Sequence, residues 1–312
     1  MLEVSVDVSS YVAALYHGLL GRAPDIAGLQ HFTAVAQQDG LSEVVTALVG
    51  SAEYQRRQAQ QTRPMPIELP TLDRELVIVD VGAQKLASEE HIYTPLRKSG
   101  ISHRCIGFEP LEHRRAEMMA DDPELQLFPD FIGDGSSQTF YINNDDATSS
   151  LLPLNSDLNA DLEHLETLET VDAQPVSTST LDNVLRDVPV VDFLKLDIQG
   201  MELRALKGGT EILDRTNVIH CEVEFAPIYK DQPLFSDVEL FLREHGFTFV
   251  DFTAECRYAY VGQNFKERLG WGDAVFFRAG ANGRDRIAQA TIATYVYGKN
   301  GLAERLLADR FL

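Results

Sequence analysis

The sequence predicts an α/β fold in which a mostly parallel sheet is covered by helices on both faces. From residue 74 onward, short apolar runs alternate with helix-like stretches, which is typical of strand–helix–strand units. The runs at 76–82 and 190–198 are apolar almost throughout, as expected of strands that are buried on both faces. Hydrophobic residues make up 44% of the 312 positions, enough for a packed core.

The individual elements follow from this alternation. Strands are predicted at 76–82, 104–110, 125–134, 138–143, 190–198, 217–225, 247–252 and 273–278. Helices are predicted at 88–100, 111–122, 201–213 and 236–246. The last two strands follow each other without a helix between them, which favours one antiparallel strand at an edge of the sheet. The acidic stretch 144–180 is predicted to be a loop or a lid.

Helical segments are predicted at both ends of the chain. Residues 9–60 place apolar side chains at helical spacing, and a proline-rich stretch then marks a linker. The predicted regions are an all-α domain at 1–62, a linker at 63–73, the α/β domain at 74–280 and a helical tail at 281–312. The tail carries an apolar stripe consisting of Leu302, Leu306, Leu307 and Phe311. We expect this stripe to pack on the sheet or to join two copies of the chain in a homodimer.

Charge and composition exclude several classes of function. The formal net charge is −21, from 27 Lys and Arg against 48 Asp and Glu, so a nucleic-acid partner is not expected. The three cysteines are far apart and show no CxxC pairing, which argues against a zinc site and suits a reducing compartment. The sequence shows neither a signal-peptide pattern nor an apolar stretch of about 18 residues. We therefore expect a cytoplasmic protein without a membrane span.

Two acids at neighbouring strand ends predict a nucleoside site. Asp80 and Gly82 close the run "VIVDVGAQ", where a glycine lets the backbone approach a ligand. Glu109 closes the next strand in "GFEP", where a carboxylate can accept hydrogen bonds from the two hydroxyls of a ribose. No glycine follows Gly82 until Gly100, so the glycine-rich pyrophosphate loop is missing and NAD is disfavoured. S-adenosylmethionine, which has a ribose and no phosphate, fits this pattern better.

A second group of acids follows the strands at 190–198 and 217–225. Alternation places Asp197 at the carboxyl end of the first of these strands, and the second brings Glu222 and Glu224 to the same edge of the sheet. Asp197, Glu222 and Glu224 could hold a divalent cation through oxygen ligands. Alternatively, Asp197 and Glu222 could act as the general base for a hydroxyl nucleophile. The residues alone leave both alternatives open.

Seven motifs occur in a fixed order along the α/β part: "VIVDVGAQ", "GFEP", "SSL", "STLDNVL", "DFLKLDIQGMELRALKGG", "VIHCEVEF" and "WGDAVFFR". In this order they resemble FkbM-type methyltransferases, over about residues 74–278. The resemblance implies a class I methyltransferase-like Rossmann sheet with S-adenosylmethionine as cofactor. It also implies transfer of the methyl group to a hydroxyl oxygen, often on a sugar or a polyketide. The motif at 192–209 is the most specific of the seven.

The resemblance assigns roles to particular positions. The family's first cofactor loop corresponds to Asp80, Gly82, Ala83 and Gln84. Glu109 corresponds to the ribose-binding acid, and Ile132 and Asp134 lie in the segment where class I enzymes line the adenine. Asp197 and Glu202 correspond to the "D-x-E-G-x-E" block.

The sequence departs from the family pattern at three positions. Gln84 stands where the family usually has Asn, Leu86 where it usually has Gly, and Gln199 where it usually has Glu. The first two changes lie in the cofactor loop. The third removes an acid from the block that contains Asp197.

The N-terminal stretches "LYHGLLGRAPDIAGLQHF" and "SAEY" are similar to a small helical domain of unknown function with the signature L-G-R-x-x-D-x-x-G-L. This domain is often found in surface-layer, secreted or glycan-related proteins. Arg22 and Asp25 of the signature are expected to form a structural bridge or a helix cap. The functional alternative is a module that recruits a glycan or a protein partner.

These patterns together predict an S-adenosylmethionine-dependent O-methyltransferase. Its acceptor would be a hydroxyl-bearing small molecule, a saccharide or a glycan. The alternative is a non-catalytic glycan- or protein-binding assembly protein with a degenerate methyltransferase fold. The three departures from the family pattern motivate this alternative.

Overall fold

The computed structural model describes residues 8–61, 67–83, 90–121 and 125–311, so the expectations for Gln84 and Leu86 lie outside the described residues. The chain divides into two compact units, Met1–Met65 and Pro66–Leu312, and each is described by itself. Within the described ranges, no helix is long and apolar enough to cross a membrane.

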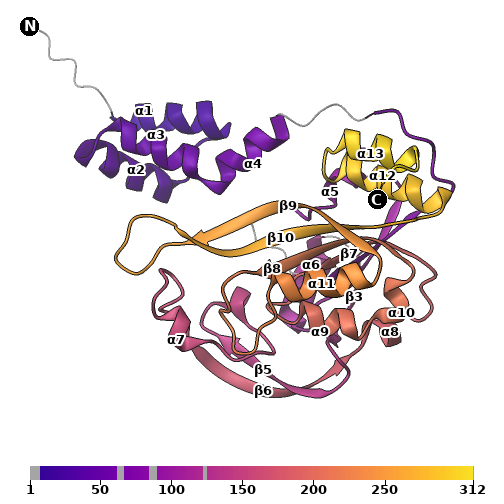
Figure 1. The fold of residues 1–312 in the computed structure, drawn as a ribbon. Coiled ribbons are helices and arrows are strands. Elements are labelled where there is room, and N and C mark those ends of the chain that lie inside the picture. The colour runs from indigo at the N-terminus through magenta and orange to yellow at the C-terminus, as the bar shows by residue number, and fades with distance from the viewer. Residues whose placement is uncertain (1–7, 62–66, 84–89, 122–124, 312) are drawn as a thin grey trace, which may run out of the picture. The chain divides into compact units, whose positions relative to one another are not determined.

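The first unit is a group of helices: α1 (Val8–Leu15), the π-helical η1 (Tyr16–Leu20), α2 (Ile26–Gln38), α3 (Leu41–Gly50) and α4 (Ala52–Gln61) (Figure 1). Its buried core consists of Val12, Tyr16, Leu20, Val44 and Leu48. Asp25 is the N-cap of α2 and accepts a hydrogen bond from the Gly28 N–H at 2.6 Å. Arg22 pairs with Glu53 through two hydrogen bonds. Both signature residues are thus used in structural contacts.

The second unit is built on a seven-stranded sheet with the order β3-β2-β1-β7-β8-β10-β9. Its strands are β1 (Leu76–Val81), β2 (His103–Phe108), β3 (Gln126–Phe128), β7 (Val191–Leu196), β8 (Thr216–Glu224), β9 (Phe247–Tyr258) and β10 (Arg268–Arg278). β1 pairs in parallel with β2 and β7, whereas β10 is antiparallel to both of its neighbours. The mostly parallel sheet with one antiparallel strand is confirmed. That strand, however, lies second from the edge, and β9 forms the edge.

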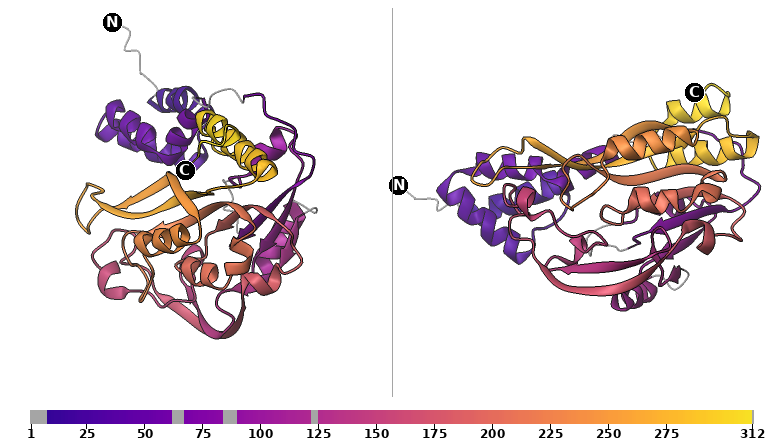
Figure 2. Two further views of the ribbon diagram at one scale, coloured as in Figure 1. Left: turned by 45° about the vertical axis from the view of Figure 1, so that its right-hand side comes forward. Right: turned by 60° about the horizontal axis from the view of Figure 1, so that its bottom comes forward.

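Helices cover both faces of this sheet (Figures 1 and 2). One face packs against α8 (Leu181–Val184), α9 (Glu202–Lys207), α10 (Thr210–Leu213) and α11 (Phe235–Glu244). The other face packs against α5 (Thr94–Lys98), α12 (Gly283–Tyr295) and α13 (Asn300–Leu307). Along β7, Phe193 enters one core and Leu194 the other, as the predicted alternation requires. The remaining long helix, α6 (Glu112–Asp121), connects β2 to β3.

The apolar stripe of the tail packs within its own chain. Leu306 is only 1% exposed, and the ring of Phe311 lies 6.1 Å from the ring of Phe277 on β10. Leu302 and Leu307 are partly buried against the same core. Because the sheet already covers these side chains, the stripe gives no support to the homodimer that the sequence suggested.

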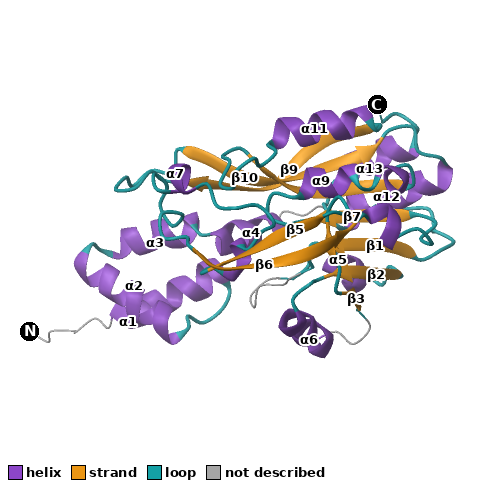
Figure 3. Ribbon diagram, turned by 90° about the horizontal axis from the view of Figure 1, so that it is seen from below, coloured by secondary structure: helices purple, strands orange, loops and turns teal. Residues whose placement is uncertain are grey.

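The prediction of a loop over 144–180 is wrong in part. A ten-residue strand, β6 (Thr170–Ser179), pairs with β5 (Ser137–Asn143) and β4 (Phe131–Ile132) in a second sheet (Figure 3). Between β5 and β6 the chain forms η2 (Asp146–Thr148) and α7 (Ser156–Asn159). This stretch buries five leucines around Tyr229, namely Leu151, Leu152, Leu154, Leu162 and Leu165. It belongs to a core and is not a surface excursion.

Candidate active site

The candidate site lies at the carboxyl ends of β1, β7 and β8, beside the point where the strand order reverses. Gly82 follows β1 with φ of 79°, and a Cβ there would lie 1.8 Å from the carbonyl oxygen of Asp197. Only glycine fits this left-handed turn against backbone. The close approach that Gly82 permits is therefore to the exit of β7. The sequence had suggested an approach to a ligand.

Asp80 is fully buried and anchors a charged cluster at the end of β1. Its Oδ1 accepts a hydrogen bond from Lys195 Nζ at 3.2 Å, and its Oδ2 accepts one from the Tyr93 hydroxyl at 3.0 Å. Burial alone would raise the pKa of Asp80, but the Lys195 ammonium and His91 offset it and lower the pKa. Asp80 thus faces the protein interior. The sequence predicted that Asp80 would face a crevice shared with Glu109; among the described residues, its hydrogen-bond partners are Lys195 and Tyr93.

Lys195 connects the exits of β1 and β7. Its Nζ donates to the Gly82 carbonyl oxygen at 3.2 Å and lies 3.6 Å from Asp197 Oδ2. Although burial opposes a charged amine, Asp80 and Asp197 together raise the pKa of Lys195, so its ammonium is charged at neutral pH. Through this ammonium, Asp80 is linked to the carbonyl oxygen of Gly82.

Three further predicted cofactor residues lie around the exits of β2 and β4. Glu109 is buried, its Oε1 accepts the Leu111 N–H at 2.8 Å, and burial raises its pKa. Ile132 is buried and belongs to the same apolar core as Phe108, the last residue of β2. Asp134 is exposed, and hydrogen bonds from Ser136 lower its pKa.

The backbone of the β1 exit contacts the end of β2. The backbone N–H groups of Gly82 and Ala83 both donate to the Phe108 carbonyl oxygen. These contacts bring the β1 exit beside Glu109.

A glutamine joins the two predicted catalytic acids. Gln199 Nε2 donates to Glu222 Oε2 at 2.9 Å and lies 3.3 Å from Asp197 Oδ1. Gln199 Oε1 accepts a hydrogen bond from the Tyr229 hydroxyl at 3.0 Å. The side chain of Asp197 is 40% exposed, whereas Glu222 is 9% exposed. The structure therefore brings Asp197 and Glu222 together at one place, with one member of the pair open to solvent.

The surroundings of Glu222 make it a stronger base than an ordinary carboxylate. Burial raises its pKa well above the usual value, and the neighbouring charges of Asp197 and Glu224 raise it further. Glu224 is buried two residues further along β8, and burial raises its pKa as well. Opposite Glu222 on β10 lies Asp273. Burial would raise the pKa of Asp273, but His220 offsets this and lowers it.

The donor set fits S-adenosylmethionine better than a metal ion. Among the residues that the structure describes, no group of three or more His, Cys, Asp or Glu side chains is placed to hold a cation. The predicted metal candidates Asp197 and Glu222 face an amide nitrogen of Gln199, which is a donor. For the cofactor, the Glu109 carboxylate beside Ala83 offers acceptors for ribose hydroxyls.

Glu202 holds the turn between β7 and α9. Its Oε1 accepts the N–H groups of Ile198 at 2.8 Å and Gly200 at 3.3 Å. Burial raises the pKa of Glu202 from 4.5 to about 7. The turn that contains Gln199 thus depends on Glu202, whose carboxyl group keeps its proton up to a pH of about 7.

Glu202→Gln is expected to become more stable than the wild type as the pH rises. The native state holds a proton on Glu202 that the unfolded state releases between pH 4.5 and about 7, so wild-type stability falls over that window. Glutamine keeps the acceptor and has no proton to lose. Its advantage should grow by about 2–3 kcal/mol between about pH 5 and pH 8. Urea unfolding followed by the single tryptophan, Trp271 on β10, measures it. A pH-independent difference would contradict the prediction.

Sequence reasoning missed two groups in this site. Lys195 is not among the predicted site residues, although its register opposite Asp80 makes it the centre of the cluster. Tyr229 lies in the loop after β8, within no recognisable motif, and its single hydroxyl proton is shared between the Thr148 carbonyl oxygen at 2.7 Å and Gln199 Oε1 at 3.0 Å. The only sequence signal for Tyr229 was its position in a loop that follows a strand ending in acids.

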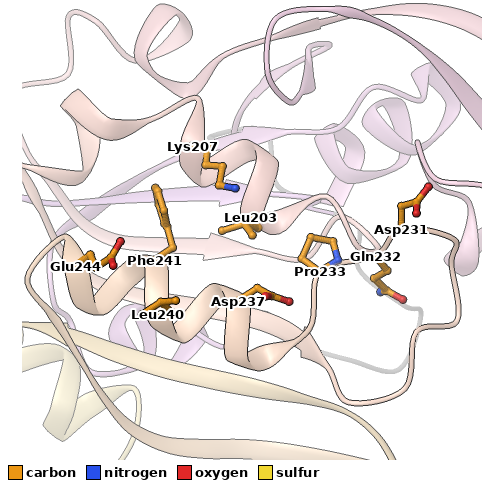
Figure 4. A pocket seen from close by; sticks show the side chains of 9 residues that line it. All are labelled: Leu203, Lys207, Asp231, Gln232, Pro233, Asp237, Leu240, Phe241 and Glu244. Carbon is orange, nitrogen blue, oxygen red and sulfur yellow. The ribbon is translucent and has the colours of Figure 1, made fainter.

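A pocket of ≈ 560 Å³ lies between α9 and α11 (Figure 4). Leu203, Leu240 and Phe241 give it an apolar lining, and none of the predicted catalytic or cofactor residues lines it. Gln232 lies at the end of this pocket and accepts the Tyr229 N–H, so the pocket and the site share one loop. The pocket flanks the candidate site and is not the crevice expected from the strand ends.

The strand order and the polar cluster at the carboxyl ends of the parallel strands define a class I methyltransferase-like fold. The FkbM methyltransferase domain matches residues 80–249, more than half of the chain, and the protein belongs to this family of S-adenosylmethionine-dependent methyltransferases. A domain of unknown function, DUF4214, matches residues 3–58. The predicted resemblance of each part is confirmed.

Two solved structures show distant similarity to this chain. A TehB-like SAM-dependent methyltransferase from Corynebacterium glutamicum is 13% identical with a TM-score of 0.32, covering 78% of this chain and 98% of that chain. The 23S rRNA methyltransferase ErmE is 8% identical with a TM-score of 0.30, covering 84% of this chain and 83% of that chain. No curated protein matches the sequence.

Proposed function

We propose that the protein transfers the methyl group of S-adenosylmethionine to a hydroxyl oxygen of a saccharide or glycan. The observation that carries the O-methyl proposal is the buried carboxylate of Glu222, joined through Gln199 to the half-exposed Asp197. A hydroxyl is a weak nucleophile until a base accepts its proton, and this pair supplies such a base. The saccharide acceptor rests on the resemblance to FkbM-type enzymes and to a helical domain found in glycan-related proteins.

Each part of the site has a distinct task in this reaction. When bound, S-adenosylmethionine supplies an electrophilic methyl carbon on a sulfonium sulfur. Glu109 and the backbone at Gly82 and Ala83 hold the ribose end of the cofactor. Ile132 and Asp134 lie beside its adenine. Glu222, together with Asp197, accepts the proton of the acceptor hydroxyl as its oxygen bonds to the methyl carbon. Aligning the reacting atoms supplies much of the rate, so few catalytic side chains are needed.

Two further parts of the proposal concern organisation. The helical unit that precedes the methyltransferase domain is proposed to recruit the glycan or its carrier, while residues 74–280 perform the transfer. The few, widely spaced cysteines support a cytoplasmic location, where thiols stay reduced.

The proposed function is tested in two steps. The full-length protein is titrated calorimetrically with S-adenosylhomocysteine, and binding with Kd below about 100 μM is expected. Glycans from cells with and without the active protein are then compared by mass spectrometry for methyl-sized mass differences. No binding at high micromolar ligand overturns the enzyme proposal. Binding of glycans without any methyl transfer favours the non-catalytic assembly protein.

A further inference from the structure

Gln199 uses every polar atom of its side chain inside the site. The two hydrogens of Nε2 point to one oxygen each of Asp197 and Glu222, and Oε1 accepts from Tyr229. This orientation of the amide gives each of its polar atoms a suitable partner, because carboxyl oxygens can accept from Nε2 and the Tyr229 hydroxyl can donate to Oε1. Its backbone oxygen accepts the Ser150 hydroxyl at 2.6 Å. The residue is thus held from four directions.

The backbone of Gln199 has a strained conformation in the turn between β7 and α9. Its φ is 55°, a left-handed conformation that costs a residue with a Cβ about 1 kcal/mol. Gly200 follows with φ of 94°, so the chain makes a sharp turn between β7 and α9. The turn is fixed from outside by Glu202, which accepts the Ile198 and Gly200 N–H groups. Strain that neighbouring contacts maintain in this manner is a feature of functional sites.

The amide of Gln199 lies between two carboxyl groups, the kind of oxygen ligand that holds divalent cations in proteins. Asp197 and Glu222 come from neighbouring parallel strands, and a third oxygen between them would complete a site for a hard divalent ion. The sequence supplies an amide nitrogen at that point. The neutral Gln199 amide donates one hydrogen bond to each carboxyl group. It thereby offsets part of the repulsion between them, which a bound cation would otherwise do.

We propose that Gln199 is a positioning residue that holds Asp197 and Glu222 as a pair and takes the place of a divalent cation, so that methyl transfer proceeds without one. The proposal rests on the proposed function, because it specifies how the same carboxylates work. It assigns the departure from the family's usual Glu a mechanistic consequence: the site uses an amide donor, and its proton acceptor stays free of metal.

The first test needs no acceptor substrate. Manganese chloride is titrated calorimetrically into the wild type, Gln199→Glu and Gln174→Glu. Gln174 is an exposed glutamine that also donates to an aspartate, Asp172, so its variant is a matched control for one added charge. Only Gln199→Glu is expected to bind Mn²⁺, with Kd on the order of 10⁻⁴ M, because it alone gains a third carboxylate between Asp197 and Glu222.

The outcomes of this titration separate the alternatives. Binding to the wild type that Asp197→Asn abolishes overturns the proposal, since the amide would then not exclude a cation. A Gln199→Glu variant that keeps the wild-type fluorescence of Trp271 and yet binds no Mn²⁺ also overturns it. If Gln199→Glu does not fold, the Mn²⁺ titration of the wild type and the turnover of Gln199→Ala test the proposal instead.

The second test uses the acceptor that the methyl-transfer assay identifies. Wild-type turnover should be unchanged in excess EDTA. Gln199→Ala should lower kcat by about 10²-fold with the KM for S-adenosylmethionine within about twofold, because it disturbs the alignment of the base and not cofactor binding. A merely structural role would lower stability without this split between kcat and KM. Loss of turnover in EDTA, restored by Mg²⁺, overturns the inference. Absence of turnover with every acceptor overturns the proposed function instead, and the titration still tests Gln199.

Discussion

Glu222→Gln is expected to lower kcat for methyl transfer by about 10²–10⁴-fold, the range of general-base contributions, while S-adenosylhomocysteine affinity stays within about twofold. Glutamine has nearly the same volume and can turn its carbonyl oxygen toward Gln199 Nε2, which keeps the 2.9 Å contact. It cannot accept a proton from a hydroxyl. Single-turnover rates and calorimetry on the same preparation measure the two effects separately.

Two controls show whether the effect belongs to the carboxylate pair. Glu224→Gln removes a neighbouring buried carboxyl with a raised pKa but leaves the Glu222 carboxyl and its hydrogen bond with Gln199 in place, so kcat should fall far less than in Glu222→Gln. Asp197→Ala should lose turnover while still binding cofactor. A Glu222→Gln variant with more than about half of the wild-type kcat would show that Glu222 is not the base.

The same residue sets the expected pH dependence of the rate. Because burial raises the pKa of Glu222, its carboxyl keeps a proton to higher pH than usual and is then inactive as a base. Wild-type kcat should therefore rise with pH as Glu222 loses that proton. In Glu222→Gln the residual rate should lack this rise. A wild-type rate that falls as the pH increases through the same range would contradict the assignment.

The sheet was predictable because its strands are apolar and its helices are short and regular. Strand β6 was not predictable, because its ten residues are mostly exposed and polar and include Pro175. It exists because it pairs with β5, which is a contact between segments about 30 residues apart. The leucines between 151 and 165 were taken for a loop because they follow neither a helical nor a strand period. Their burial depends on Tyr229, far away in sequence.

The part of the site that lies at the ends of the strands was predictable from the sequence. Asp197 and Glu222 arrive at one edge, as alternation along each strand indicates. The inward orientation of Asp80 was not predictable, because it depends on the register of β1 against β7, which places Asp80 directly opposite Lys195. Register follows from packing between strands that are more than 100 residues apart, and a single sequence does not record it.

Lys195→Met is expected to lower the free energy of unfolding of the sheet unit by about 3–5 kcal/mol, the typical result of removing one member of a buried ion pair. Asp80 is fully buried, and its partner Lys195 is largely so. Without the ammonium, the partners that remain to the Asp80 carboxylate among the described residues are uncharged Tyr93 and a more distant His91. The lowered pKa of Asp80 means that the pair stabilises the fold above the ordinary Asp pKa and loses this effect only as the pH falls. Urea unfolding at neutral pH, followed through Trp271, measures the change.

A double-mutant cycle distinguishes the lost pair from lost packing. Adding Asp80→Asn to Lys195→Met removes the stranded charge and should recover about half of the loss, since replacing both members of a buried pair is far less harmful than replacing one. Lys98→Met breaks an exposed pair with Glu90 and should cost no more than about 1 kcal/mol. If the double variant is as unstable as the sum of its single variants, Lys195 acts through its aliphatic packing. In that case Asp80 does not hold the exits of β1 and β7 together by charge.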